Sequence, residues 1–110
     1  MATILTQAWL DEQREAAAGL PARPGVSARL QHVVTGAPGG EARYVTVIED
    51  GRITEAALGD DPDADLVLTQ SFADAERLAS GELDLSAAFM QGRVKVVGDI
   101  GTFLALQPLL

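Results

Sequence analysis

The sequence predicts an α+β domain in which helices cover one face of a five-stranded, mainly antiparallel sheet. Three strand-like runs follow one another between residues 28 and 58, whereas helix-like segments alternate with strands only in the second half. This grouping is typical of α+β folds. The chain has 110 residues, of which 47% are hydrophobic, so we expect one domain spanning residues 1–110.

The first half of the chain is expected to hold one helix and four strands. The helix runs from Met1 to Gly19, with Thr3 or Thr6 as its cap and with Leu5 and Trp9 four residues apart on one face. A stiff connector rich in proline follows. The strands are expected at Ala28 to Thr35, Ala42 to Glu49, Ile53 to Leu58 and Leu66 to Gln70. Asp50-Gly51, between the second and third strands, is the strongest hairpin signal in the chain.

Capping signals define the second half. Ser71, with Asp74 three residues later, begins a helix that runs to Ala79, and Asp84 begins a short helix that Gly92 ends. A strand from Arg93 to Val97 follows, and Gly98-Asp99 opens a last helix. That helix carries too many apolar residues for one narrow stripe, namely Phe103, Leu104, Leu106, Leu109 and Leu110. Such a helix is buried nearly all round or faces an apolar guest.

The charge and composition exclude several classes of partner. The net charge is −8, and Lys95 is the only lysine, which opposes binding to nucleic acid and to anionic membranes. There is no cysteine, so disulfides and zinc–thiolate sites are excluded. The N-terminal residues do not resemble a signal peptide, and no apolar run is long enough for stable membrane insertion. We therefore expect a soluble, cytoplasmic protein.

No group of residues has the spacing of a catalytic, cofactor or metal site, and we expect none of these. In the acidic loop, Leu66 and Phe72 stand where a calcium loop starting at Asp61 needs glycine and glutamate, so a solvated turn is expected. The only histidine, His32, lies in a strand-like run, where a packed histidine is the simpler interpretation. Tyr44 and Gln70 could each place a polar group in an apolar cavity.

The second half of the chain resembles the sterol carrier protein 2 (SCP-2) family. The resemblance lies in Gly81-Glu82-Leu83-Asp84 and in the run from Ala88 to Asp99, AFMQGRVKVVGD, which is followed by an apolar helix. It implies helices that enclose an apolar cavity against the sheet, and binding of sterols, fatty acids, acyl-CoAs or similar lipids without catalysis. The candidate lining residues that it implies are Phe89, Met90, Val94, Val96, Phe103, Leu106, Phe72 and Leu68.

The sequence leaves three functions open. The first is non-catalytic carriage of an apolar ligand by a small protein whose alanine- and arginine-rich composition suits a bacterial source. The second is a biosynthetic cyclase or isomerase that uses the same cavity, for which His32, Tyr44 and Gln70 are the candidate polar groups. The third is a partner-binding module, for example a homodimer that packs through Phe103, Leu106, Leu109 and Leu110.

Overall fold

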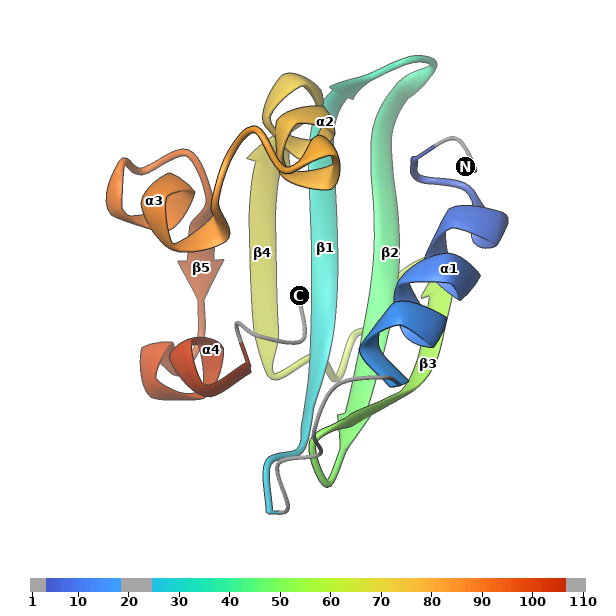
Figure 1. The fold of residues 1–110 in the computed structure, drawn as a ribbon, viewed down its shortest axis with the longest axis vertical. Coiled ribbons are helices and arrows are strands. Elements are labelled where there is room, and N and C mark those ends of the chain that lie inside the picture. Colours follow the sequence, from blue (N-terminus) through green and yellow to red (C-terminus); the bar gives the residue numbers. More distant parts are fainter. Residues whose placement is uncertain (1–3, 19–24, 107–110) are drawn as a thin grey trace.

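A computed structural model describes residues 4–18 and 25–106 of the chain. In this part, four helices lie against one five-stranded sheet, as Figure 1 shows. The elements in chain order are α1 (Gln7–Ala18), β1 (Ala28–Ala37), β2 (Gly40–Glu49), β3 (Arg52–Leu58), β4 (Leu66–Ser71), α2 (Phe72–Ser80), α3 (Leu85–Met90), β5 (Lys95–Val97) and α4 (Ile100–Leu106). The α+β class expected from the sequence is confirmed.

The sheet has the strand order β3-β2-β1-β4-β5, which places β1 at its centre. β1 pairs with β4 in parallel, and the other three pairs are antiparallel. The register aligns one row of side chains across all five strands, formed by Leu58, Tyr44, His32, Leu68 and Val96. The mainly antiparallel sheet is confirmed, and this row brings residues from both halves of the chain together.

The β2–β3 connection is the tight hairpin that Asp50-Gly51 predicts. Both residues have positive φ angles, 50° and 75°, the combination that a type I′ turn requires. The β1–β2 connection is tighter than expected, because Ala37 already pairs with Gly40 around Pro38 and Gly39. Gly39 has a φ of 86°, which lets the chain reverse within two residues and lengthens both strands.

The capping predictions for the helices are also confirmed. The Ser71 hydroxyl accepts the Asp74 N–H at 3.2 Å, and an Asp84 carboxylate oxygen accepts the Ala87 N–H at 3.2 Å. Thr6 caps α1 in the same way by accepting the Trp9 N–H at 3.2 Å. Each side chain satisfies a backbone donor that the first turn of a helix leaves unpaired.

Two predicted element boundaries were wrong. The first helix was expected from Met1 to Gly19, two ends that lie outside the described residues, but residues 4–6 are not helical and α1 begins at Gln7, because Leu5 has a φ of 66° that no α-helix accommodates. The last strand was expected from Arg93, but β5 begins at Lys95. The backbone N–H groups of Arg93 and Val94 donate to the Ala88 carbonyl instead, and so close the end of α3.

The helices lie on one face of the sheet and form two separate apolar clusters with it. In Figure 1, α1 crosses β2 and β3, and α2 lies over β1 and β4. The first cluster gathers α1, α2 and the middle strands and consists of Leu10, Val34, Tyr44, Ala56 and Ala75. The second gathers α3, α4 and the other ends of the strands and consists of Ala28, Leu30, Ile48, Leu66, Leu68, Leu83, Ala88, Val94, Phe103 and Leu106.

The side chain of Gln7 attaches α1 to the outer edge of β3. Its amide nitrogen donates to the Ala56 carbonyl at 2.8 Å, and its amide oxygen accepts the Leu58 N–H at 3.4 Å. Backbone groups two residues apart in a strand point to the same side. β3 is an edge strand, and these two groups point away from its neighbour β2. Gln7 therefore fixes the helix to the sheet by the hydrogen bonds that a further strand would make.

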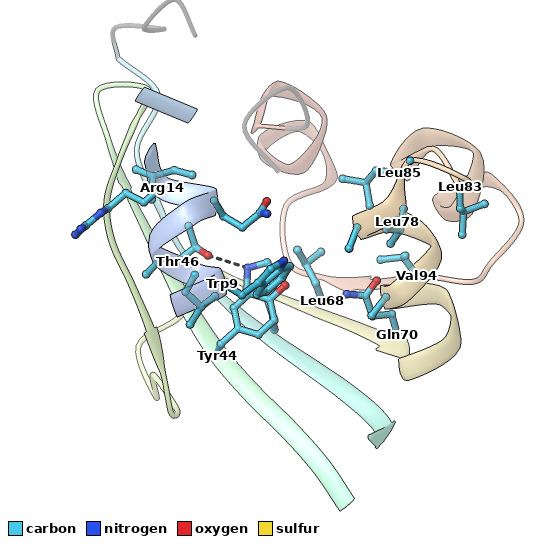
Figure 2. Close-up of a pocket in the computed structure, with 18 of the residues that line it drawn as sticks. Trp9, Arg14, Tyr44, Thr46, Leu68, Gln70, Leu78, Leu83, Leu85 and Val94 are labelled. Carbon is cyan, nitrogen blue, oxygen red and sulfur yellow. Dashed lines mark hydrogen bonds between the residues drawn. The ribbon is translucent and has the colours of Figure 1, made fainter. Parts of the chain in front are cut away.

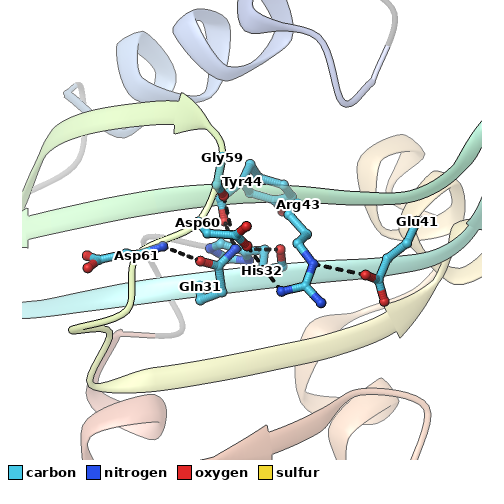
Figure 3. A network of polar contacts seen from close by, with 8 residues as sticks. All are labelled: Gln31, His32, Glu41, Arg43, Tyr44, Gly59, Asp60 and Asp61. Atoms are coloured by element: carbon cyan, nitrogen blue, oxygen red, sulfur yellow. Dashed lines mark hydrogen bonds and ion pairs between the residues drawn. The ribbon is translucent and has the colours of Figure 1, made fainter.

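A polar network holds the acidic loop against the sheet, as Figure 3 shows. Its centre is the buried side chain of Gln31, whose amide nitrogen lies within 3.2 Å of the carbonyls of His32, Tyr44 and Gly59. Its amide oxygen accepts the Asp61 N–H at 2.6 Å. One glutamine therefore joins two strands to the loop that follows β3.

Two arginines form ion pairs with two of the four aspartates of the acidic loop. Arg29 Nε lies 2.6 Å from Asp61, and Arg43 lies 3.1 Å from Asp60. The hydrogen bond from Arg29 lowers the pKa of the Asp61 carboxyl. Within the described residues, no three acidic or histidine side chains come together as a metal site would require. Ion pairs attach the loop to strands β1 and β2.

Candidate functional site

A pocket of about 570 Å³ lies between the two apolar clusters, on the helix-covered face of the sheet. Its floor is made by side chains from β1, β2 and β4, namely His32, Tyr44, Thr46, Leu68 and Gln70. Members of both clusters border the space, including Leu10 and Ala75 from one and Leu83 and Val94 from the other. The sheet thus carries two cores with a gap between them.

The walls of the pocket come from α1, near the start of the chain, and from the α2–α3 region in its second half. α1 contributes Trp9, Leu10, Gln13 and Arg14, and the α2–α3 region contributes Ala75, Leu78, Ala79, Leu83 and Leu85. Figure 2 shows Trp9 and Arg14 on one side of the space and Leu78, Leu83 and Leu85 on the other. The charged lining residues within the described chain are Arg14 and Asp84, and both are exposed. The buried floor therefore carries no residue that is charged at neutral pH, and the charges lie at the rim.

Three rings pack together at the side of the pocket nearest α1. The His32 and Tyr44 rings are parallel, with an interplanar angle of 5° and centroids 4.1 Å apart. Trp9 meets Tyr44 edge to face at 5.6 Å, a favoured geometry for aromatic pairs. His32 Nε2 is hydrogen-bonded to the Thr46 hydroxyl at 3.1 Å. These contacts give the pocket a fixed aromatic wall.

Burial keeps the ring groups of the floor uncharged. Desolvation lowers the pKa of His32 from 6.5 to about 3, because its imidazolium form would lose its hydration. The same cause raises the pKa of the Tyr44 hydroxyl above its ordinary value. Gln70 adds an uncharged amide, whose oxygen is buried and accepts no hydrogen bond from the described residues.

The eight lining candidates expected from the resemblance occupy different places. Leu68 and Val94 line the pocket. Phe103 and Leu106 have no exposed surface and lie in the same cluster as those two, so they support the pocket wall from behind. Val96 and Phe89 pack against that cluster, and the Phe89 ring lies 5.0 Å from the Phe103 ring. Phe72 packs against the other cluster, and Met90 is 82% exposed.

Several lining residues were not among those candidates, namely Trp9, Leu10, Ile53, Ala56, Ala75, Leu78 and Leu83. Part of the signal was present in the sequence. The sequence pattern placed Trp9 on an apolar face of the first helix, and Ala75, Leu78 and Ala79 follow the three- and four-residue spacing of an apolar helix face. His32, Tyr44 and Gln70, considered only as possible polar groups, all face this one pocket.

Within the described part of α4, two of the four residues considered for a partner interface are buried, whereas Ile100 and Leu104 of the same helix are exposed. Phe103 and Leu106 are fully buried within the chain, so they are not available to a partner. Leu109 and Leu110 lie outside the described residues. As for membranes, none of the helices in residues 4–18 and 25–106 is long and apolar enough to cross one.

Comparison with known proteins places the chain in a family. Residues 7–110 match the SCP-2 sterol transfer family. Sterol carrier protein 2 from Gallus gallus is 34% identical over 73 residues, which are 66% of this chain and 13% of the chicken protein. The chain thus spans only a small part of the length of that relative.

Solved structures share the fold. The crystal structure of sterol carrier protein 2 like 2 from Aedes aegypti superposes with a TM-score of 0.74 and 14% identity over 97% of each chain. The solution structure of the palmitated form from the same organism gives a TM-score of 0.73 and 16% identity, over 99% of this chain and 94% of that one. Since the family match covers nearly the whole chain, the protein belongs to the SCP-2 sterol transfer family.

Proposed function

We propose that this protein binds an apolar molecule in the pocket between its two clusters and carries it without changing it chemically. The ligand class is a lipid such as a sterol, a fatty acid or an acyl-CoA. The observation that carries the proposal is the space of about 570 Å³ over the centre of the sheet. Pockets that bind small molecules have volumes of about 300–1,000 Å³ and mostly apolar linings with a few polar groups.

The lining supports binding driven by apolar burial. Each Å² of apolar surface that leaves water contributes about 25 cal/mol, so an extended hydrocarbon gains affinity along its whole length. Leu68 and Val94 provide such surface on the floor and one side, and the rings of Trp9 and Tyr44 provide it on the other. Membership of the family and the palmitated state of the Aedes aegypti relative agree with this ligand class.

Catalysis is the second candidate, because His32, Tyr44 and Gln70 meet in one pocket. The buried environment of these side chains favours ligand binding over acid–base catalysis. An imidazole whose pKa is about 3 holds a proton too weakly to act as a base near neutrality, where an effective catalyst has a pKa close to the working pH. The raised pKa of Tyr44 makes its hydroxyl a poorer acid as well. The three groups therefore suit recognition of a ligand better than proton transfer.

A binding experiment with a matched pair of variants tests carriage in this pocket. Ala75 lines the pocket from α2, whereas Ala73 lies on the same helix, is exposed and does not line the pocket. Ala75→Phe places a ring in the space, and Ala73→Phe places the same ring in solvent. We expect saturable binding of a fluorescent fatty acid to the wild type and to Ala73→Phe, and at least tenfold weaker binding to Ala75→Phe.

Two outcomes would contradict the proposal. The first is no saturable binding of any fatty acid or sterol probe by folded wild-type protein at micromolar concentration. The second is unchanged affinity in Ala75→Phe, which would place the ligand elsewhere. Thermal melts of both variants show whether each is folded, so a loss of binding can be separated from a loss of structure.

A further inference from the structure

The amide of Gln70 is the one buried side-chain group of the described residues with an unsatisfied oxygen. Gln70 lies on β4 opposite Val34 of β1, and its side chain faces the pocket beside Leu68, as Figure 2 shows. A buried acceptor without a donor is costly and is rare in folded proteins. The sequence places a glutamine where an apolar residue would fill the space at no such cost.

The other polar groups of the floor differ from Gln70 in this respect. His32 and Thr46 are hydrogen-bonded to each other at 3.1 Å. The charged lining residues, Arg14 and Asp84, are exposed at the rim. Among the described residues, Gln70 is therefore the floor residue with a buried side-chain oxygen that accepts no hydrogen bond, and what this oxygen lacks is a donor.

We propose that the Gln70 amide recognises the polar end of the ligand, so that the pocket prefers an apolar molecule ending in a hydroxyl group to one ending in a carboxylate. This inference rests on the proposed function. A hydroxyl donates a hydrogen bond to the amide oxygen. An ionised carboxylate only accepts hydrogen bonds, and its negative charge is repelled by the partial negative charge of that oxygen. A carboxylate would also be a buried charge among uncharged groups, which is costly without a paired cation.

Three probes of equal chain length separate the chemistry: 1-dodecanol, its methyl ether and dodecanoate at pH 8. The ether keeps the oxygen but has no proton to donate. Trp9 is the only tryptophan and lines the pocket, so its fluorescence reports binding without a label. The protein variants are Gln70→Leu, which removes the acceptor and nearly keeps the volume, and Gln91→Leu, the same change at an exposed position outside the pocket.

We expect the wild type and Gln91→Leu to bind the alcohol about tenfold more tightly than the ether or the carboxylate, which is the effect of one hydrogen bond to an otherwise unpaired buried group. In Gln70→Leu, the affinity for the alcohol falls to that for the ether, and the affinity for the ether is unchanged. Without ligand, Gln70→Leu melts at the wild-type temperature or above it, because the variant has no unpaired oxygen to bury.

Binding of the ether with no preference for the alcohol would overturn this inference and leave the proposed function standing. The inference also fails if Gln70→Leu keeps the wild-type preference for the alcohol over the ether, or if dodecanoate binds the wild type most tightly of the three probes. It fails as well if unliganded Gln70→Leu melts at a lower temperature than the wild type, which would show a structural role for the amide. Absence of binding by all three probes would instead remove the proposed function, and this inference with it.

Discussion

Replacing Gln31 by leucine should destabilise the protein strongly, although Gln31 lies on the face of the sheet that no described helix covers. The amide nitrogen has two protons, so its three carbonyl contacts amount to about two full hydrogen bonds. The bond that the amide oxygen accepts from the Asp61 N–H adds a third. At about 1 kcal/mol for each bond, the free energy of unfolding should fall by about 3 kcal/mol.

Equilibrium unfolding in urea, at pH 7 and moderate salt, measures this loss. For a domain of this size, a loss of about 3 kcal/mol lowers the melting temperature by about 10–15 °C. Gln91→Leu is the matched control, because that side chain is exposed and bonds only Arg93, so it should change the stability by less than about 0.5 kcal/mol. A loss below about 1 kcal/mol in Gln31→Leu would refute the reasoning, since the network would then be replaceable by water.

Three further perturbations have outcomes that the structure determines. Phe103→Ala removes a fully buried ring and its contact with Phe89, so urea unfolding should show a loss of about 3–5 kcal/mol, and a loss below about 2 would contradict full burial. Gly98→Ala would place its Cβ 2.5 Å from the Asp65 carbonyl oxygen at a φ of +128°, whereas Gly36→Ala meets nothing within 4 Å at +72°. Gly98→Ala should therefore lose about 3 kcal/mol and Gly36→Ala about 1 kcal/mol by the same measurement, and equal losses would be evidence against the clash. His32 has a pKa of about 3 in the folded protein and an ordinary value of 6.5. Between these two values the unfolded chain takes up a proton that the folded chain does not, so the contribution of His32 to folding stability is complete above pH 6.5 and is lost as the pH falls toward 3. In urea unfolding at several pH values below 6.5, the free energy of unfolding of the wild type should thus fall more steeply than that of His32→Gln, by about 1.4 kcal/mol per pH unit. Parallel plots of the two free energies against pH would contradict a buried neutral imidazole.

Elements that depend on signals within a few residues could be predicted from the sequence. Asp50-Gly51 specifies its turn through two positive φ angles, and Ser71 and Asp84 begin helices by accepting N–H groups three residues on. These interactions are complete inside one turn of chain, so no knowledge of the fold is needed. The parallel pairing of β1 with β4 has no such local signal, because the two strands meet only through the packing of the whole domain.

The site was harder to predict because it depends on the direction of side chains between distant elements. Met90 follows Phe89 in the motif that suggested a lipid carrier, yet it points into solvent, since α3 is a six-residue helix whose rotation is fixed by docking. Trp9 lies in a helix from which only packing was expected, and it forms a pocket wall instead. Periodicity identifies a helix face, but only the tertiary contacts decide whether that face meets a core or a gap.

The attachment of Gln7 to β3 has a consequence for the behaviour of the protein at high concentration. An edge strand with free N–H and C=O groups is a template on which another chain can add a strand and begin aggregation. At β3, the Ala56 carbonyl and the Leu58 N–H are already bonded to Gln7, and the strand carries an irregular register against β2. At the opposite edge, β5 is only three residues long and includes Lys95. Both edges of the sheet are thus poorly suited to strand addition, which opposes association of two copies of the chain through their sheets.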